Sequence, residues 1–457
     1  MSKNKFEIDM INGKIMGKMI SFALPLMLSG ILQLLFNAVD IIVVGRFSGS
    51  QSLAAVGSTS ALINMLTNLF IGISLGTNVL AARFYAAGKH KEMSETVHTS
   101  ITTAFVGGVI MIFVGIMFAK PALALMDTPS DVIEKATIYM RIYFIGMPFF
   151  MLYNFGAAVL RAVGDTKRPL IFLVISGVVN ACLNMFLVIV FKMDVAGVAI
   201  ATVISQMISC ILVIGCLYRT DAVYRLQFKK LRIKWKYLLK IFKIGVPAGL
   251  QSTLISFSNV LLQSSVNSFG SVAMAGYTAA NNILSFLYMA ANSISQACMS
   301  FTSQNYGACK PKRMDRVLAD ALILQLIVCL SLGTLAYVFG NQVSSIYTED
   351  PNVIKASVEI LALTTIPYFL CGFMDTFPGT LRGMGRSTVP MILCLLGTVG
   401  VRILWIFLFF PHNRTLRYLF ISYPASWIAT ILMQLVYFIF IRKSVHRELN
   451  SQTAKTL

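Results

Sequence analysis

Charged residues are scarce in this chain, and their scarcity excludes an ordinary soluble protein. Only 12% of the 457 residues are Asp, Glu, Lys or Arg, whereas 57% are hydrophobic, which is more than the interior of a globular domain can enclose. The apolar stretches are too long for β-barrel spans, which alternate over ~10 residues. Most of them reach the ~20 residues that an α-helix needs to cross a bilayer. The sequence therefore predicts an all-α polytopic membrane protein.

Acidic residues are fewer still, with 18 against 38 basic residues and a net charge of +20. Nucleic acid is not expected as the partner, because most basic residues fall in alternate loops between the apolar stretches. This pattern predicts a multi-pass protein of the inner (plasma) membrane, in contact with its lipids and with both termini in the cytoplasm. The basic stretch 219–240 is expected to lie on the anionic inner leaflet.

Cysteine patterns and enzyme motifs are also missing. The eight cysteines fall almost entirely within apolar stretches and have no pairing pattern, so neither disulfides nor a metal site is expected. The chain has no HExxH motif, no GxSxG at a span and no paired Asp of an intramembrane protease. We therefore expect no enzyme activity and no cofactor other than a coupling ion.

Twelve long apolar stretches are present, and each is predicted to be a transmembrane helix. They lie at residues 17–45, 53–82, 97–119, 132–158, 169–191, 195–218, 241–267, 272–305, 316–340, 353–379, 387–410 and 418–441.

An internal repeat divides these helices into two sets of six. LRAVGDTKRPLI at 160–171 matches LRGMGRSTVPMI at 381–392 without a gap, and Pro25 matches Pro247. Six spans per copy bring both copies into the membrane from the same side, which predicts parallel, pseudo-symmetric bundles. The expected organisation is a lobe at 1–218, a basic linker at 219–240, a second lobe at 241–443 and a cytoplasmic tail at 444–457. The repeated motif is expected to form structural turns that contain Arg161, Gly164, Arg382 and Gly385.

Three segments together resemble a known transporter family. They are NAVDIIVVGRFSGSQSLAAVG at 37–57, GISLGTNVLAARFYAAGK at 72–89, and the paired turns LRAVGDT and LRGMGRS. They are similar to the multidrug and toxic compound extrusion (MATE) transporters over nearly the whole chain. The resemblance implies twelve helices in two pseudo-symmetric lobes. It also implies export of cationic or amphipathic compounds against an inward flow of protons or sodium ions.

Asp40 is the first candidate for a coupling residue, because it lies inside the apolar run LLFNAVDIIVVG. A carboxylate in hydrocarbon costs ~2.5–3.5 kcal/mol even on the lenient insertion scale, so Asp40 is expected to have partners. A rise of ~1.5 Å per residue places Asn180, Asn184 and Thr202 at a similar depth. The alternative role for Asp40 is a fixed acceptor that holds helices together, and the alternative for Asn184 is an interhelical hydrogen bond.

The resemblance adds a specific pattern around Asp40. The family places an Asn, an acidic residue four positions later and a Thr on the next helix beside the first-span Asp. Here these positions are Asn180, Asn184 and Thr202, so the acidic one has lost its charge. A single carboxylate suits a proton better than a tightly bound sodium ion. Protons are therefore favoured as the coupling ion, and sodium is the second possibility.

The remaining intramembrane polar residues are candidates for the substrate cavity or a gate. They are Asn37, Asn259, Asp375 and Glu359. Asp375 is expected either to attract a cationic substrate or to pair with a basic residue at the cytoplasmic gate. Arg141 and Arg402 are expected to be buried cations, with Glu359 or carbonyl oxygens as partners.

The predicted function is a secondary active multidrug exporter that works as a monomer by alternating access on small amphipathic or cationic molecules. The alternative is a lipid-linked oligosaccharide flippase of the same superfamily. Such a carrier favours a strongly cationic cavity, whereas only two basic residues, Arg141 and Arg402, are expected in the cavity of this protein. The repeat is also unequal, because Asp40 matches Leu262, and Asn180 and Asn184 match Val401 and Trp405.

Overall fold

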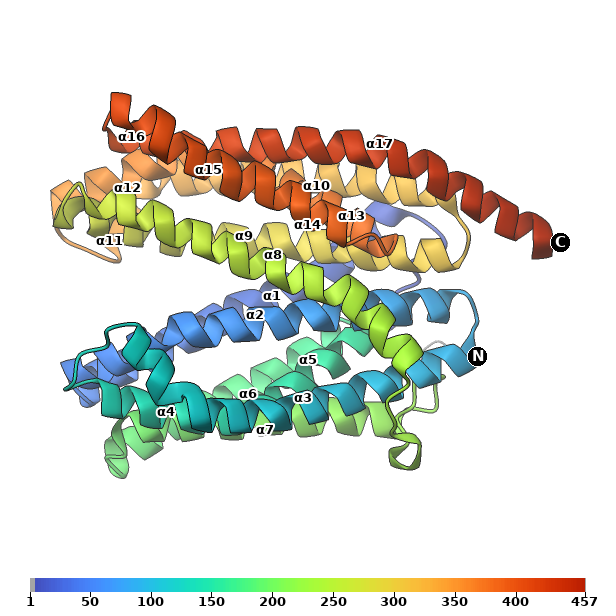
Figure 1. The fold of residues 1–457 in the computed structure, drawn as a ribbon, viewed down its shortest axis with the longest axis horizontal. Coiled ribbons are helices and arrows are strands. Elements are labelled where there is room, and N and C mark those ends of the chain that lie inside the picture. Colours follow the sequence, from blue (N-terminus) through green and yellow to red (C-terminus); the bar gives the residue numbers. More distant parts are fainter. Residues whose placement is uncertain (1–4, 457) are drawn as a thin grey trace. The chain divides into compact units, whose positions relative to one another are not determined.

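The computed structural model describes residues 5–456, and within them the chain is all-helical, without strands (Figure 1). The first half contains α1 (Ile15–Phe47), α2 (Ser50–Ala86), α3 (His90–Leu125), α4 (Ile133–Ile145), α5 (Met147–Ala162), α6 (Lys167–Met185) with a π-helical turn Phe186–Val190, and α7 (Asp194–Arg219). A 3₁₀ turn, Phe228–Lys230, lies in the linker.

The second half repeats this order. It contains α8 (Trp235–Asn267), α9 (Ser271–Gly307), α10 (Pro311–Val338), α11 (Gly340–Ser345), α12 (Pro351–Thr364), α13 (Tyr368–Gly383), α14 (Thr388–Cys394), α15 (Val401–Leu404), α16 (Leu416–Phe420) and α17 (Ser422–Thr456). The π-helical segments Leu395–Gly400 and Trp405–Phe409 flank α15, and a 3₁₀ turn follows at Phe410–His412. In Figure 1, α17 is one continuous helix up to the C-terminal end, so residues 444–456 prolong it.

The helices match the twelve expected spans. Within residues 5–456, nine helices are long and apolar enough to cross a membrane, and the number rises to eleven when each of two bent pairs is one span. The remaining expected span is α9, which has no charged residue but is rich in Ser, Asn and Gln. Most of its side chains are buried against the rest of the protein. The all-helical multi-span fold in two repeats is confirmed.

The two bent pairs occupy equivalent places in the repeat. The angle between α4 and α5 is 45°, and that between α12 and α13 is 51°. Pro148 is at the start of α5 and Pro367 directly precedes α13. A proline ring removes a backbone donor and clashes with the preceding turn, which explains the break.

Contacts divide the chain into two compact units that exchange helix ends. Of the described residues, unit 1 contains 28–245 with 5–8, and unit 2 contains 9–27 with 246–456. The beginning of α1 therefore belongs to unit 2, and the beginning of α8 belongs to unit 1, whereas the sequence-based division kept these helices whole. Both divisions occur close to Pro25 and Pro247, which lie inside α1 and α8.

The repeated motif forms the same turn in each unit. Gly164 and Gly385 have φ angles of +99° and +74°, which L side chains rarely adopt. In unit 1 the N–H of Asp165 donates to the carbonyl of Leu160, and in unit 2 the N–H of Arg386 donates to that of Leu381. These six-to-one bonds close the ends of α5 and α13 in the Schellman manner.

Candidate functional site

The Asp40 side chain of α1 lies beside two asparagines of α6 in unit 1. The amide nitrogen of Asn184 donates to Asp40 Oδ1 and also to Asn180 Oδ1, 3.2 Å away. Asn180 and Asn184 are buried, whereas Asp40 is half-buried. The two asparagines are one helical turn apart and therefore share a face of α6. Three of the four residues expected at the ion site are thus brought together.

A glycine allows this close approach of α1 to α6. A Cβ atom at Gly177 would lie 1.8 Å from Cζ of Phe36, so only glycine leaves room for the ring. Phe36 is one turn before Asp40 on α1, and Gly177 is about two turns before Asn184 on α6. The packing of Phe36 on Gly177 therefore sets the height at which Asp40 meets Asn184.

One oxygen of this cluster has no donor. Asn184 Oδ1 is buried, and no hydrogen bond reaches it within the described residues. A buried amide oxygen without a partner costs about 1–3 kcal/mol. Asn184 Oδ1 and the Asp40 carboxylate together provide two ligands for a small cation. Alternatively, Asn184 Oδ1 provides an acceptor for a proton carried by Asp40.

Thr202 does not complete the cluster through a hydrogen bond to Asp40. Its hydroxyl donates to the carbonyl of Val198, 3.0 Å away within α7. Two aromatic residues that the sequence analysis did not select, Tyr139 and Tyr143 of α4, interact electrostatically with Asp40. Their spacing of four places both on one face of α4, which is the signal that could have indicated them.

The candidate gate residues behave differently from one another. Asn37 and Glu359 are exposed. Asp375 of α13 is half-buried, and its carbonyl accepts from Ser295 Oγ at 2.7 Å. Its carboxylate interacts electrostatically with Arg382, while Oδ2 is buried without a hydrogen bond in the described part of the chain. Of the two roles expected for Asp375, this arrangement favours interaction with a basic residue.

Arg382 and Arg161 are the two arginines of the repeated turn. Arg382 donates to Gln251 Oε1 at 2.5 Å and lies near Asp375. The Nε atom of each arginine is buried without a hydrogen bond among residues 5–456. Arg161 interacts electrostatically with Tyr153.

The structure differs from the expectation for the burial of Arg141 and for the partner of Arg402. Arg141 is exposed, so its predicted burial is wrong. Arg402 is 3% exposed, but its partners are Asn259, Ser426 and Tyr423 and not Glu359. Glu359 is exposed on α12, whereas Ser357 and Ile360 of the same helix are buried.

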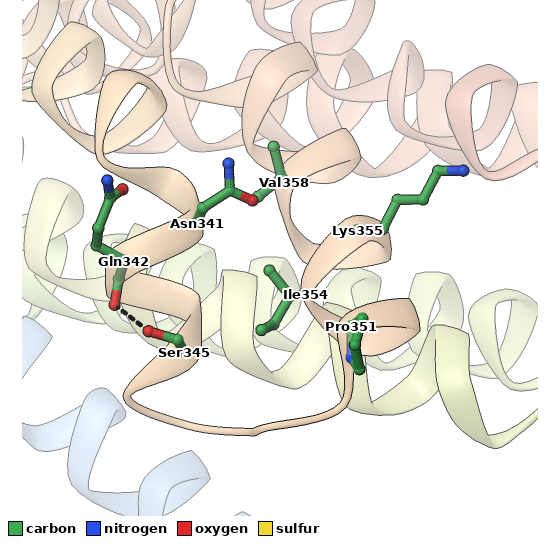
Figure 2. A pocket seen from close by; sticks show the side chains of 7 residues that line it. All are labelled: Asn341, Gln342, Ser345, Pro351, Ile354, Lys355 and Val358. Atoms are coloured by element: carbon green, nitrogen blue, oxygen red, sulfur yellow. Dashed lines mark hydrogen bonds between the residues drawn. The ribbon is translucent and has the colours of Figure 1, made fainter.

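A surface cavity of about 530 Å³ lies between α11 and α12 in unit 2. Figure 2 shows the hydrogen bond between Ser345 and Gln342 on one side and the Lys355 side chain extending away on the other. The lining has one charged group and no titratable pair, so the cavity does not hold the candidate ion site. Among residues 5–456, no three His, Cys, Asp or Glu side chains are grouped as metal ligands.

The family model named MatE matches residues 25–187 and again 247–408. The chain belongs to the MatE family. The two matches coincide with the internal repeat, and Asp40, Asn180 and Asn184 lie in the first. The protein is therefore a multi-span membrane transporter and not an enzyme.

Relatives and solved structures agree with this assignment. The probable multidrug resistance protein YoeA of Bacillus subtilis (strain 168) is 31% identical over 433 residues, which cover 92% of this chain and 93% of the relative. The multidrug export protein MepA of Staphylococcus aureus (strain NCTC 8325 / PS 47) is 24% identical over 394 residues, covering 85% and 86%. A structure described as the outward-facing conformation of a multidrug resistance MATE family transporter has a TM-score of 0.90 at 20% identity, covering 98% and 100%.

Proposed function

We propose that this MatE-family transporter exports small amphipathic or cationic compounds by alternating access and couples export to the inward flow of an ion. Family membership and the similarity to multidrug resistance and export proteins support the substrate class.

The observation that carries the ion coupling is the Asp40 cluster. Asp40 contacts Asn184, Asn184 contacts Asn180, and Asn184 Oδ1 is left without a donor among the described residues. An intramembrane carboxylate with neutral neighbours carries an uncompensated charge, and binding of a cation or a proton removes this cost. Loading and unloading of Asp40 therefore change the energy of the surrounding helices, which is the basis of coupling.

A proton is the favoured ion. The cluster has one carboxylate, and the oxygens that accompany it belong to neutral amides. A sodium ion stripped of water needs several oxygen ligands and benefits from more than one negative charge, whereas a proton needs one titrating group.

The decisive experiment compares ion gradients in proteoliposomes that contain the full chain. Export of an ethidium-like dye is measured with a pH gradient alone and with a sodium gradient alone. We expect the pH gradient to drive export and Asp40→Asn to abolish it. Asp320→Asn is the matched control, because Asp320 is another enclosed carboxylate, 9% exposed, that pairs with Arg316 in unit 2. Normal dye export by Asp40→Asn would refute the role of Asp40, and a strict need for sodium would refute proton coupling.

We further propose that both termini are cytoplasmic in the inner (plasma) membrane and that one chain is the working unit. The support is the excess of basic residues in alternate loops. Protease protection of terminal tags in intact cells tests the orientation, since cleavage from outside would contradict it. Export by protein reconstituted at less than one chain per vesicle tests the monomer.

A lipid-linked oligosaccharide flippase remains the alternative function. It requires free basic groups for a pyrophosphate, but the Arg402 guanidinium is already held by Asn259 and Ser426, and Arg141 is exposed. Movement of labelled lipid headgroups between leaflets without dye export would replace the exporter by the flippase.

A further inference from the structure

Arg402 is a buried cation without an acidic partner among the described residues. It lies on α15, inside the eleventh expected span, and is 3% exposed. No ion pair of residues 5–456 includes it. An uncompensated charge at such a position is expensive, and an intramembrane ionisable residue is by default a candidate for a functional role.

Three neutral groups from two other helices hold the guanidinium. Its Nη1 donates to Asn259 Oδ1 of α8 at 2.9 Å, and its Nε donates to Ser426 Oγ of α17 at 3.2 Å. The Tyr423 ring of α17 lies 4.2 Å from Cζ, in cation–π contact. An amide oxygen, a hydroxyl oxygen and a ring face are groups that bind cations. The pocket around Arg402 is therefore a cation-binding site, and the cation that it binds is the guanidinium of Arg402 itself.

The internal repeat places Arg402 and its partners on the helices that correspond to those of Asp40, Asn180 and Thr202. The step from Asn180 to Val401, the residue before Arg402, also leads from Thr202 to Tyr423 and from Ser205 to Ser426. The step from Pro25 to Pro247 leads from Asn37 to Asn259.

A repeated hydrogen bond supports this correspondence. Ser205 Oγ donates to the carbonyl of Thr202 at 2.8 Å, and Ser426 Oγ donates to the carbonyl of Tyr423 at 2.8 Å. The three helices α1, α6 and α7 of unit 1 therefore correspond to α8, α14–α15 and α16–α17 of unit 2. In the first set Asp40 of α1 contacts α6, and in the second set Arg402 of α15 contacts α8 and α17.

We propose that Arg402 is a tethered cation, which permanently fills in unit 2 the place that an exchangeable cation or proton fills in unit 1. The inference deepens the proposed function and rests on it for the exchange at Asp40. An arginine is not deprotonated in proteins and cannot leave its ligands. Unit 2 therefore stays in the loaded state throughout the cycle, and only unit 1 responds to the ion. Arg402 acts as a positioning residue, because it links α15 to α8 and α17.

The first test is chemical rescue of purified full-length protein in detergent. Arg402→Ala is expected to lower Tm by roughly 5 °C or more, because Asn259, Ser426 and Tyr423 lose their cation. Guanidinium chloride at millimolar concentration should restore several degrees by refilling the site, whereas tetramethylammonium chloride should not. Arg414→Ala is the control, because Arg414 is exposed. Absence of a guanidinium-specific gain in folded Arg402→Ala would overturn the proposal.

A second pair of variants decides the matter if Arg402→Ala does not fold. Arg402→Lys keeps the charge, and Arg402→Met keeps the length without the charge. We expect a higher Tm for Arg402→Lys than for Arg402→Met. We also expect Arg402→Lys to carry out ion-driven dye export. Equal or greater stability of Arg402→Met would show that the site needs no cation and would overturn the proposal.

These results are independent of the Asp40 experiment. Rescue of Arg402→Ala by guanidinium together with normal export by Asp40→Asn would refute the proposed coupling site while leaving the filled site in unit 2. Loss of export in Asp40→Asn together with a cation-independent Arg402 site would do the reverse.

Discussion

Helices that correspond in the repeat of units 1 and 2 hold opposite charges. In unit 1, the carboxylate of Asp40 lies beside Asn184, whose own oxygen has no donor within residues 5–456. In unit 2, the guanidinium of Arg402 lies between Asn259, Ser426 and Tyr423. In the proposed mechanism a proton or a cation binds the first arrangement, whereas the second contains its own cation. Only one copy of the duplicated fold would then exchange an ion.

The packing of α1 on α6 is the point at which unit 1 is most easily broken. Gly177→Leu places side-chain atoms where the Phe36 ring lies, and overpacking of this kind costs about 1–3 kcal/mol or more. We expect loss of dye export and a clear fall in Tm. Gly57→Ala is the control, because a methyl group at this position of α2 would meet no other atom within 4 Å, and Tm should be unchanged or slightly higher. Wild-type export by Gly177→Leu would contradict this packing.

The two turns of the repeat provide a milder comparison. Gly164→Ala and Gly385→Ala both impose a positive φ on an L residue, which costs about 1–2 kcal/mol. A Cβ at Gly164 would also lie 2.5 Å from the carbonyl oxygen of Ile8. We therefore expect the larger fall in Tm for Gly164→Ala. An equal fall in Tm for both variants would show that the backbone at Ile8 moves away from the new Cβ without loss of stability.

Asn184→Asp sharpens the assignment of the ion. It adds a second carboxylate next to Asp40 and restores the acidic position that the family resemblance implies. The additional negative charge should strengthen sodium binding, so we expect sodium-stimulated dye export that the wild type lacks. The corresponding change in unit 2, Trp405→Asp, should not produce sodium stimulation. Unchanged ion preference in Asn184→Asp would mean that position 184 does not contribute a ligand.

Helices α3 and α10 correspond in the repeat, and each has an ion pair near its first turns. The smallest effects are expected from these two ion pairs. Lys234 donates to Glu95 in unit 1 with one nitrogen, whereas Arg442 in unit 2 contacts both oxygens of Asp315 at 2.9 Å. Partly exposed pairs contribute about 0–1 kcal/mol, and bidentate pairs contribute more. Asp315→Asn should therefore lower Tm slightly more than Glu95→Gln. The opposite order would contradict the geometric argument.

The sequence predicted the fold well because hydropathy and the repeated turn motif depend on neighbouring residues. The expected spans and the turns at Gly164 and Gly385 were recognisable from short stretches of sequence. The exchange of the first turns of α1 and α8 between the units depends on long-range packing, which no local pattern encodes.

The candidate site was predicted only in part. Depth counting and the family resemblance brought Asp40, Asn180 and Asn184 together, because helical rise is regular. They did not indicate that Thr202 bonds within its own helix, that Tyr139 and Tyr143 lie near Asp40, or that Arg402 is held by Asn259 and not by Glu359. Those contacts depend on the rotation of each helix about its axis, and a one-residue rotation changes every partner.

The number of cations that one chain exchanges tests the difference between the units most directly. Uptake and release are counted on purified protein, as proton release on dye binding in weakly buffered solution and as binding of radioactive sodium. We expect one exchangeable ion per wild-type chain, one in Arg402→Lys, and none in Asp40→Asn. A second exchangeable ion in the wild type, or one that persists in Asp40→Asn, would contradict this expectation.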